Sequence, residues 1–255
     1  MKRRMFSGSD PNFPYLSEYD RYKFPIPETC PDDIIAIGGN LSPGMLLSAY
    51  EQGLFPWYNP EDPLLWQSPN PRMVLLPENL HISSSMKKVF KKGKFRFVLD
   101  CDFSSVIKNC AEIFRPDQDG TWITEDIITA YTEMHRLGWA HSAETYQDGE
   151  LVGGLYGIRL GKAFFGESMF SKKPNASKFA FLNLAKILFA DDIAFIDCQA
   201  YTDHLASLGA REISRNDFLC LLRKNLSPRL YKTSYPEEDV DVMDRRGNWG
   251  LLYEL

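Results

Sequence analysis

The 255-residue sequence has few cysteines, and nothing in their arrangement suggests that they act together. Its five cysteines form no CxxC motif and follow no regular spacing. Such a set fits reduced thiols in a cytoplasm better than a disulfide framework or a zinc site. We therefore expect free thiols and no metal centre.

Long apolar runs are missing as well. No segment approaches the roughly 20 apolar residues that a membrane-spanning helix needs. The first residues, MKRRM, run directly into Ser, Gly, Asp and Pro, without the apolar stretch of a signal peptide. We predict a cytoplasmic protein that has no membrane among its partners.

The sequence also lacks an excess of positive charge, since its formal net charge is -5. No global field therefore draws it to nucleic acid or to an anionic membrane. Any polyanion would have to bind to a local cluster of positive charge. One segment, residues 81–96, holds six cations and no acid. Ser83 can cap a helix there whose lysines could follow a phosphate backbone from neighbouring turns. These lysines are Lys87, Lys88, Lys91 and Lys92. The alternative is a solvated helix face.

What the sequence does contain is ample material for a core, with 44% hydrophobic and 13% aromatic residues. Pro, Tyr and charged residues dominate residues 1–33, which we interpret as an arm lying over the body. Residues 34–96 predict a small α/β domain that carries the basic helix. Residues 97–226 predict the main domain, and residues 227–255 a C-terminal extension with weak periodicity.

The main domain changes its hydrophobic period from helical to two at residue 140. Three strands within residues 141–170, separated by turns at 148–149 and 161, predict an antiparallel meander. A helix (177–190), a strand (193–199), a helix (202–208) and a short strand (211–213) follow. This order resembles acyltransferase folds of the GNAT type. The predicted fold class is α+β, with a small N-terminal α/β domain before a GNAT-like acyltransferase domain whose mixed sheet is largely antiparallel.

Aromatic residues and prolines gather in residues 53–58 and 65–72, where we expect irregular structure. Prolines make such loops stiff, so that aromatic rings can be held ready for a flat ligand such as a nucleobase. The alternative is a small core capped by Trp57 and Trp66.

Polar groups end two of the apolar strands of the main domain. Glu167 lies in one strand pattern, and Asp197 and Gln199 end the next one along the chain. In open α/β sheets, ligands bind in the crevice at such strand ends. Alternation predicts that Asp197 and Gln199 share a face while Cys198 points to the other, which makes Cys198 a poor nucleophile.

Nine short motifs resemble, in order, those of the leucyl/phenylalanyl-tRNA–protein transferases, over about residues 35–220. They are residues 55–57 (FPW), 66–72 (WQSPNPR), 81–83 (HIS), 121–124 (TWIT), 140–142 (AHS), 151–154 (LVGG), 166–171 (GESMFS), 176–178 (ASK) and 197–199 (DCQ). The resemblance implies transfer of Leu, Phe or sometimes Met from aminoacyl-tRNA to the α-amine of proteins that begin with Arg or Lys, which marks them for N-end rule degradation.

An aminoacyl ester as donor agrees with a further absence. A GNAT-like domain that uses coenzyme A is expected to carry a Gly-rich pyrophosphate loop between the strand ending at Phe170 and the helix from Ser177. Residues 171–176 read SKKPNA instead. We therefore expect no cofactor.

The resemblance also implies roles for particular residues. Asp197 and Gln199 lie at the reacting centre, where Asp197 orients the α-amine or accepts its proton and Gln199 hydrogen-bonds the ester carbonyl or the amine. From its place in the strand pattern, rather than from the resemblance, we expect Glu167 to bind the positive charge of the acceptor's Arg or Lys; the alternative is a structural hydrogen bond to a backbone turn. Trp57 and Trp122 lie near the terminal adenosine. The donor side-chain pocket is formed by Leu155, Phe164, Phe181, Leu184 and Ile196. The family often has Arg where this chain has Ser84, which bears on tRNA affinity.

Three other readings stay open at this point. A peptidoglycan-type aminoacyl-tRNA-dependent transferase shares the fold but uses another acceptor, and usually needs two such domains. A non-catalytic tRNA-binding module retains the basic helix and makes the Asp197 and Gln199 pair structural. A coenzyme A acetyltransferase is the third. The absence of repeats favours a monomer.

Overall fold

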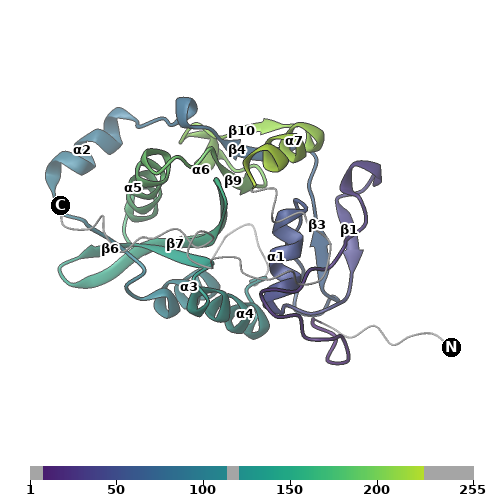
Figure 1. Cartoon of the computed structure of the whole chain (residues 1–255). Helices are drawn as coiled ribbons and strands as arrows, with labels where there is room; N and C mark the ends of the chain where they lie inside the picture. Colours follow the sequence, from purple (N-terminus) through teal and green to yellow (C-terminus); the bar gives the residue numbers. More distant parts are fainter. Residues whose placement is uncertain (1–7, 114–120, 227–255) are drawn as a thin grey trace.

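The structure, a computed structural model, describes residues 8–113 and 121–226. The predicted extension at 227–255 and the start of the predicted arm, residues 1–7, lie outside the described residues. Two sheets organise the described chain, one of three strands and one of seven (Figure 1). None of the helices in these two stretches is long and apolar enough to cross a membrane.

The larger sheet has the strand order β10-β4-β9-β8-β7-β6-β5. Its strands are β4 (Arg72–Leu75), β5 (Arg96–Leu99), β6 (Ala140–Gln147), β7 (Glu150–Leu160), β8 (Ala163–Ser171), β9 (Phe195–Gln199) and β10 (Arg211–Ile213). β8 and β9 pair in parallel, and the other neighbours are antiparallel. The predicted α+β class and the mixed, largely antiparallel sheet are confirmed.

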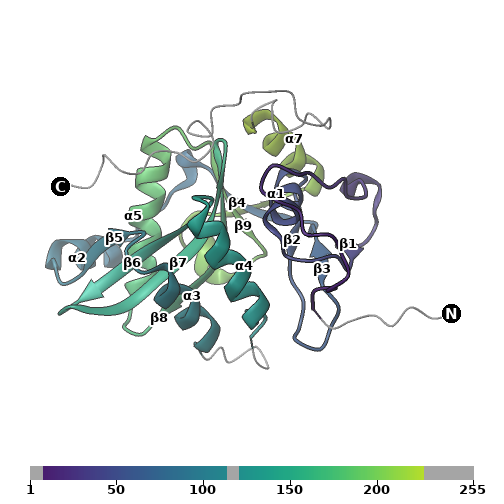
Figure 2. The same cartoon turned by 60° about the horizontal axis from the view of Figure 1, so that its bottom comes forward.

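Helices cover both faces of this sheet. They are α2 (Ser84–Lys92), α3 (Phe103–Glu112), α4 (Glu125–Arg136), α5 (Ala176–Ala190), α6 (Asp203–Ala206) and α7 (Arg215–Asn225). Because side chains alternate along a strand, Phe164 and Ile196 pack in the core under α5, whereas Phe165 and Phe195 pack in the core on the side of α3 and α4. Figures 1 and 2 show α5 on one side of the sheet and α3 and α4 on the other.

The smaller sheet has the order β1-β3-β2 and lies beside α1 (Figure 2). Its strands are β1 (Ile34–Ile37), β2 (Phe55–Pro56) and β3 (Leu65–Gln67), and α1 spans Pro43–Glu51. The expectation of irregular structure at residues 53–58 and 65–72 is therefore wrong in part, because short strands form there. Trp66 is fully buried and donates to the carbonyl of Gly38 over 2.9 Å. Trp57 is 36% exposed. Of the two residues predicted to cap a small core, Trp66 is therefore a core residue and Trp57 a surface residue.

The two sheets separate between β3 and β4. β4 lies between β9 and β10 in the larger sheet, although its residues belong to the predicted N-terminal domain. The basic helix α2 packs against α5, with the ring centroids of Phe90 and Phe179 4.8 Å apart. The local hydrophobic pattern could not reveal these partners, because they lie far along the chain. The predicted limit at residue 96 thus falls within a region that packs against the main domain.

Residues 8–33 lie over the body and are tied to it by buried polar groups. Arg215, at the start of α7 and 4% exposed, donates to the backbone carbonyls of Pro27, Cys30 and Asp32 over 2.8–3.0 Å. Its guanidinium also pairs with the Asp33 carboxylate at 3.0 Å. A buried charge needs such partners, so this part of the chain is integral to the fold.

Candidate active site

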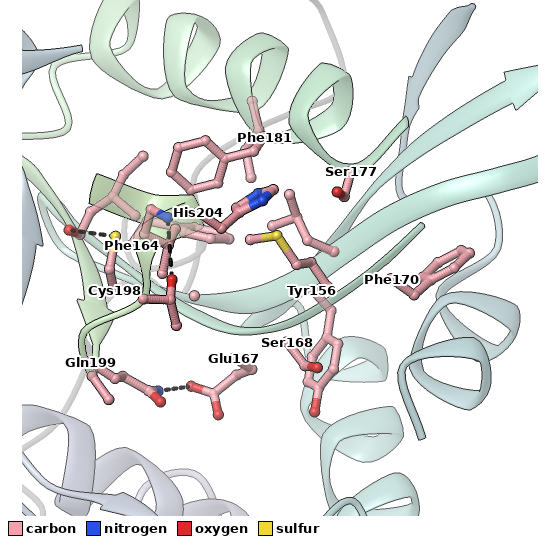
Figure 3. A pocket seen from close by; sticks show the side chains of 18 of the residues that line it. Tyr156, Phe164, Glu167, Ser168, Phe170, Ser177, Phe181, Cys198, Gln199 and His204 are labelled. Atoms are coloured by element: carbon pink, nitrogen blue, oxygen red, sulfur yellow. Dashed lines mark hydrogen bonds between the residues drawn. The ribbon is translucent and has the colours of Figure 1, made fainter. Parts of the chain in front are cut away.

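A cavity of about 440 Å³ opens where β8 and β9 part from each other. The two strands pair from Ala163 with Phe195 to Phe165 with Asp197. Beyond this point β8 continues to Ser171 without β9 beside it, and the space between the strand ends is the cavity. Its walls come from β7, β8, β9, α5 and α6 (Figure 3). Phe55 of β2, Trp57 just after β2 and Trp122 before α4 complete the lining.

The five residues predicted for the donor side-chain pocket all line this cavity. They are Leu155, Phe164, Phe181, Leu184 and Ile196, each 3% exposed or less. They come from β7, β8, α5 and β9, and they form a continuous apolar wall. Such a wall suits an aliphatic or aromatic side chain and rejects a charged one. Their role in donor binding stays a prediction.

Asp197 does not line the cavity. Its carboxylate forms a bidentate ion pair with Arg72 of β4, with Nε to Oδ1 at 2.9 Å and Nη2 to Oδ2 at 2.6 Å, and both side chains are fully buried. The Arg72 guanidinium lies between the rings of Phe55 and Phe218, 4.7 and 4.4 Å from their centroids. Asp197 also accepts the backbone N–H of Gln199 at 2.9 Å. The carboxylate thus fixes the end of β9.

The predicted alternation along residues 197–199 is wrong, because Cys198 and Gln199 both line the cavity. β9 pairs with β4 through Asp197 opposite Val74 and Gln199 opposite Met73, which leaves Cys198 as the extra residue of a bulge. Gln199 then adopts a left-handed φ of 62°. Bulges redirect side chains in this way. Burial raises the pKa of the Cys198 thiol, so it stays protonated and remains a poor nucleophile.

A second bulge presents Glu167 to the cavity. β7 and β8 pair through Tyr156 opposite Ser168 and Gly157 opposite Gly166, so Glu167 has no partner on β7. Gln199 Nε2 donates to Glu167 Oε1 at 2.9 Å, and the two side chains face each other at one edge of the cavity (Figure 3). Glu167 is the only carboxylate on the wall formed by the described residues, and Lys and Arg are absent from that wall.

Two buried tyrosines hold Glu167 from behind. Tyr50 of α1 lies 2.7 Å from Oε1, and Tyr131 of α4 lies 3.1 Å from Oε2. The two hydroxyls also bond each other. Burial raises the pKa of Glu167 to about 7, with the charge of Asp197 adding to the rise, while the tyrosine hydrogen bonds and Arg72 oppose it. Burial also raises the pKa values of Tyr50 and Tyr131 well above the usual 10, so both hydroxyls stay neutral.

The remaining predicted site residues lie in two places. Trp57 and Trp122 both line the cavity, and Trp57 stacks on Phe55 with centroids 6.3 Å apart. The lysines of α2 lie outside the cavity, on the far side of α5. Lys87, Lys88, Lys91 and Lys92 are all exposed, while Met86 of the same helix is buried. Ser83 caps this helix by accepting the N–H of Met86, as predicted, and Ser84 is exposed beside it.

Several site residues were missed from the sequence. His204 of α6 lines the cavity, and its Nε2 is buried without a hydrogen-bond partner among the described residues. Burial and the nearby Lys178 lower its pKa, so the ring is neutral near pH 7. Tyr50 and Tyr131 showed only helical spacing, which is typical of core residues.

No group of three or more His, Cys, Asp or Glu residues in the described chain is placed to hold a metal ion.

The family model for leucyl/phenylalanyl-tRNA protein transferase matches residues 74–223, and the model for its N-terminal domain matches residues 39–70. These two ranges meet where the two sheets separate. A transferase of this name from Saccharophagus degradans is 53% identical over 77% of this chain and 80% of its own. One from Dechloromonas aromatica is 49% identical over 88% of this chain and 97% of its own.

These matches first define the class, which is an aminoacyltransferase. Within that class, the chain belongs to the leucyl/phenylalanyl-tRNA–protein transferase family. Among solved structures, a GCN5-related N-acetyltransferase from Kribbella flavida is similar over 68% of this chain and 62% of its own, with a TM-score of 0.36 and 9% identity. This likeness is too distant to bear on function.

Proposed function

We propose that the protein transfers Leu or Phe, and less readily Met, from aminoacyl-tRNA to the α-amine of proteins that begin with Arg or Lys, which tags them for N-end rule degradation. The observation that carries this proposal is the composition of the cavity. An apolar wall, one carboxylate and one amide meet where β8 and β9 diverge. One methylene is worth only about 1–3 kcal/mol in an apolar pocket, so such a wall accepts Leu, Phe and Met together.

The acceptor enters, in this proposal, at the edge formed by Glu167 and Gln199. Glu167 is the only acidic residue on the described wall, so a cationic N-terminal side chain would pair with it. Gln199 hydrogen-bonds the ester carbonyl or the amine. Asp197 acts as a positioning residue, because its oxygens already hold Arg72 and the backbone N–H of Gln199. Holding amine and ester in line can be worth about 7–11 kcal/mol.

The donor lies deeper, with its side chain on the apolar wall and its terminal adenosine against Trp57 or Trp122. Stacking of a base on an aromatic ring contributes about 1–3 kcal/mol and tolerates any base. The partly buried imidazole of His204 offers its unpartnered nitrogen to a polar group of the donor.

The tRNA backbone passes, we propose, over α2. Phe179 of α5 contacts Phe90 of α2, while Phe181 of the same helix lines the cavity, so one helix separates the lysines from the donor site. A helix with its side chains is about 10–12 Å across. The end of a tRNA can therefore enter the cavity while its stem phosphates lie along the exposed lysines.

Replacing the four α2 lysines with glutamine is expected to weaken aminoacyl-tRNA binding and to flatten its salt dependence. Each lost phosphate contact lowers the slope of log Kd against log salt by about 0.7–0.9. Filter binding between 50 and 200 mM salt measures this, and transfer at saturating tRNA is expected to stay near that of the unchanged protein. Lys108→Gln on α3, across the sheet, is the control. An unchanged slope would contradict a tRNA path over α2.

Transfer of labelled Phe and Leu from charged tRNA to peptides that differ only in an N-terminal Arg, Lys, Asp or Ala tests the function. Label is expected on the Arg and Lys peptides alone. Label on the Asp peptide would retain the transferase and contradict the role of Glu167. Binding of charged tRNA without transfer to any peptide would favour a non-catalytic tRNA-binding module, and transfer to a peptidoglycan precursor would favour the related transferase class.

We also propose that the protein works in the cytoplasm as a monomer. The apolar cavity and its polar edge are both completed within one chain, so no second copy is needed to build the site. Light scattering at working concentration, with and without charged tRNA, measures the molar mass and so tests whether the protein is monomeric.

A further inference from the structure

The contacts of Glu167 raise a question of proton count. Glu167, Tyr50 and Tyr131 make three mutual oxygen contacts: Tyr50 to Oε1 at 2.7 Å, Tyr131 to Oε2 at 3.1 Å, and the two hydroxyls to each other. Each hydrogen bond needs one hydrogen, and the two tyrosines supply only two. The third must come from Glu167 itself, so the ring of three bonds is complete only when this carboxyl group is protonated.

One arrangement of the protons satisfies every contact. The protonated Oε2 donates to Tyr131, Tyr131 donates to Tyr50, and Tyr50 donates to Oε1. Gln199 Nε2 donates to the second lone pair of the same Oε1 at 2.9 Å. When Glu167 is ionised, one of the three oxygen pairs has no hydrogen between its atoms. The tyrosine hydrogen bonds lower the pKa of Glu167 and burial raises it, but all three bonds of the ring exist together only when Glu167 has gained a proton.

The charged groups around Glu167 agree with a carboxyl group that changes its state near neutral pH. Tyr50 of α1 and Tyr131 of α4 stay neutral, Gln199 of β9 carries no charge, and the opposite charges of Asp197 and Arg72 are paired with each other. Burial raises the pKa of Glu167 to about 7. The α-amine of a peptide has a reference pKa near 8. The pKa values of the proton donor, the α-amine, and of the proton acceptor, Glu167, are thus close to each other and to neutral pH, which favours general base catalysis.

We propose that Glu167 is the general base of the transfer, taking the proton that the acceptor's α-ammonium group must lose before it attacks the ester. This inference rests on the proposed function. The ammonium nitrogen gives one proton to Glu167, and its lone pair forms a bond to the ester carbonyl carbon. The bond from that carbon to the ribose oxygen breaks, and the second proton of the nitrogen goes to the departing oxygen. The products are the amide, a free tRNA hydroxyl and a protonated Glu167 in its closed ring, which later releases its proton to solvent.

Glu167→Gln tests the proposal, because an amide can reproduce the ring. Its nitrogen donates to Tyr131 and its oxygen accepts from Tyr50, as in the protonated carboxyl group, but it cannot take a proton. Single-turnover transfer from Phe-tRNA to an Arg peptide, at limiting and saturating peptide, is measured from pH 6 to pH 9. At pH 7 and saturating peptide we expect a loss of about 10²–10⁴-fold. The loss is expected to shrink towards pH 9, where the α-amine is already neutral.

A role in charge recognition alone gives another result, because the acceptor's Arg side chain stays charged at pH 9. A rise in KM with an unchanged maximal rate, or a loss of the same size at pH 7 and pH 9, would overturn the proposal. Glu133→Gln, a partly exposed carboxylate on α4, is the matched control and is expected to follow the unchanged protein at every pH. If the unchanged protein transfers to no peptide, the proposed function fails, and this inference fails with it.

A second measurement reports the proton directly and does not depend on turnover. The folded pKa of Glu167 is about 7, above the ordinary 4.5 of the unfolded chain. The folded state therefore binds more protons between these values, and this group's contribution to stability is lost as pH rises through that window. Glu167→Gln lacks the effect. Its denaturation midpoint relative to the unchanged protein is expected to be higher at pH 8 than at pH 5, and an equal difference at both pH values would overturn the proposal.

Discussion

Asp197→Asn is expected to lower the free energy of unfolding by about 3–5 kcal/mol, because it leaves the guanidinium of Arg72 buried without its opposite charge. Both side chains are fully buried, and the pair joins β4 to β9. Urea denaturation measures the loss. Transfer is expected to fall as well, since the Asp197 carboxylate also holds the backbone of Gln199.

Two further variants provide comparisons for Asp197→Asn, one with an exposed ion pair removed and one with both buried charges removed. Glu133→Gln breaks an exposed ion pair with Arg136 and is the control, expected to leave stability close to that of the unchanged protein. The double variant Arg72→Met with Asp197→Leu removes both charges, and its stability is expected to return towards that of the unchanged protein. If Asp197→Asn keeps full stability and still loses transfer, Asp197 acts in the chemistry itself.

Gly157→Ala is expected to destabilise the protein by about 1–3 kcal/mol or more and to abolish most transfer. A Cβ at Gly157 would lie 2.3 Å from the backbone oxygen of Phe165 and 2.6 Å from the ring of Phe164. A backbone oxygen cannot rotate away, so β7 and β8 must separate. Phe164 belongs to the apolar wall, and the bulge that presents Glu167 begins at this pair of strands.

Gly166→Ala is the matched control, because Gly166 lies directly opposite Gly157 in the strand register. A Cβ there would meet no atom closer than the backbone oxygen of Asp197 at 3.6 Å, which is an ordinary contact. Denaturation and transfer are measured for both variants. Equal losses at the two glycines would show that the close approach at Gly157 is not what fixes the cavity.

Local patterns in the sequence were sufficient for most of the elements. The period of two predicted β6, β7 and β8, and the hydroxyl of Ser83 predicted a helix start, where it accepts a backbone N–H as expected. α7 was missed, although Ser214 and Asp217 give it the same kind of signal, with Ser214 accepting the N–H of Asp217. Phe218, Leu219 and Leu222 also follow helical spacing, so the sequence did carry a signal for this helix.

The geometry of the site lay beyond local patterns. Asp197 and Arg72 are 125 residues apart, and Tyr50 and Glu167 are 117 apart, so neither contact has a local signal. Both bulges add one residue to a strand and change which side chains face the cavity. Alternation therefore placed Cys198 on the wrong face. The resemblance to a family identified which residues gather, but their hydrogen bonds and charge states needed the fold.

The tie between Arg215 and residues 27–33 has a consequence for synthesis. Arg215 is made 188 residues after Pro27, the first carbonyl it binds. At roughly 5–20 residues per second on a ribosome, the arm waits about 10–40 s for this partner. β4 waits similarly for β9 and β10. Folding of the nascent chain therefore cannot finish domain by domain from the N-terminus, and the cavity is completed only when almost all of the described chain has left the exit tunnel.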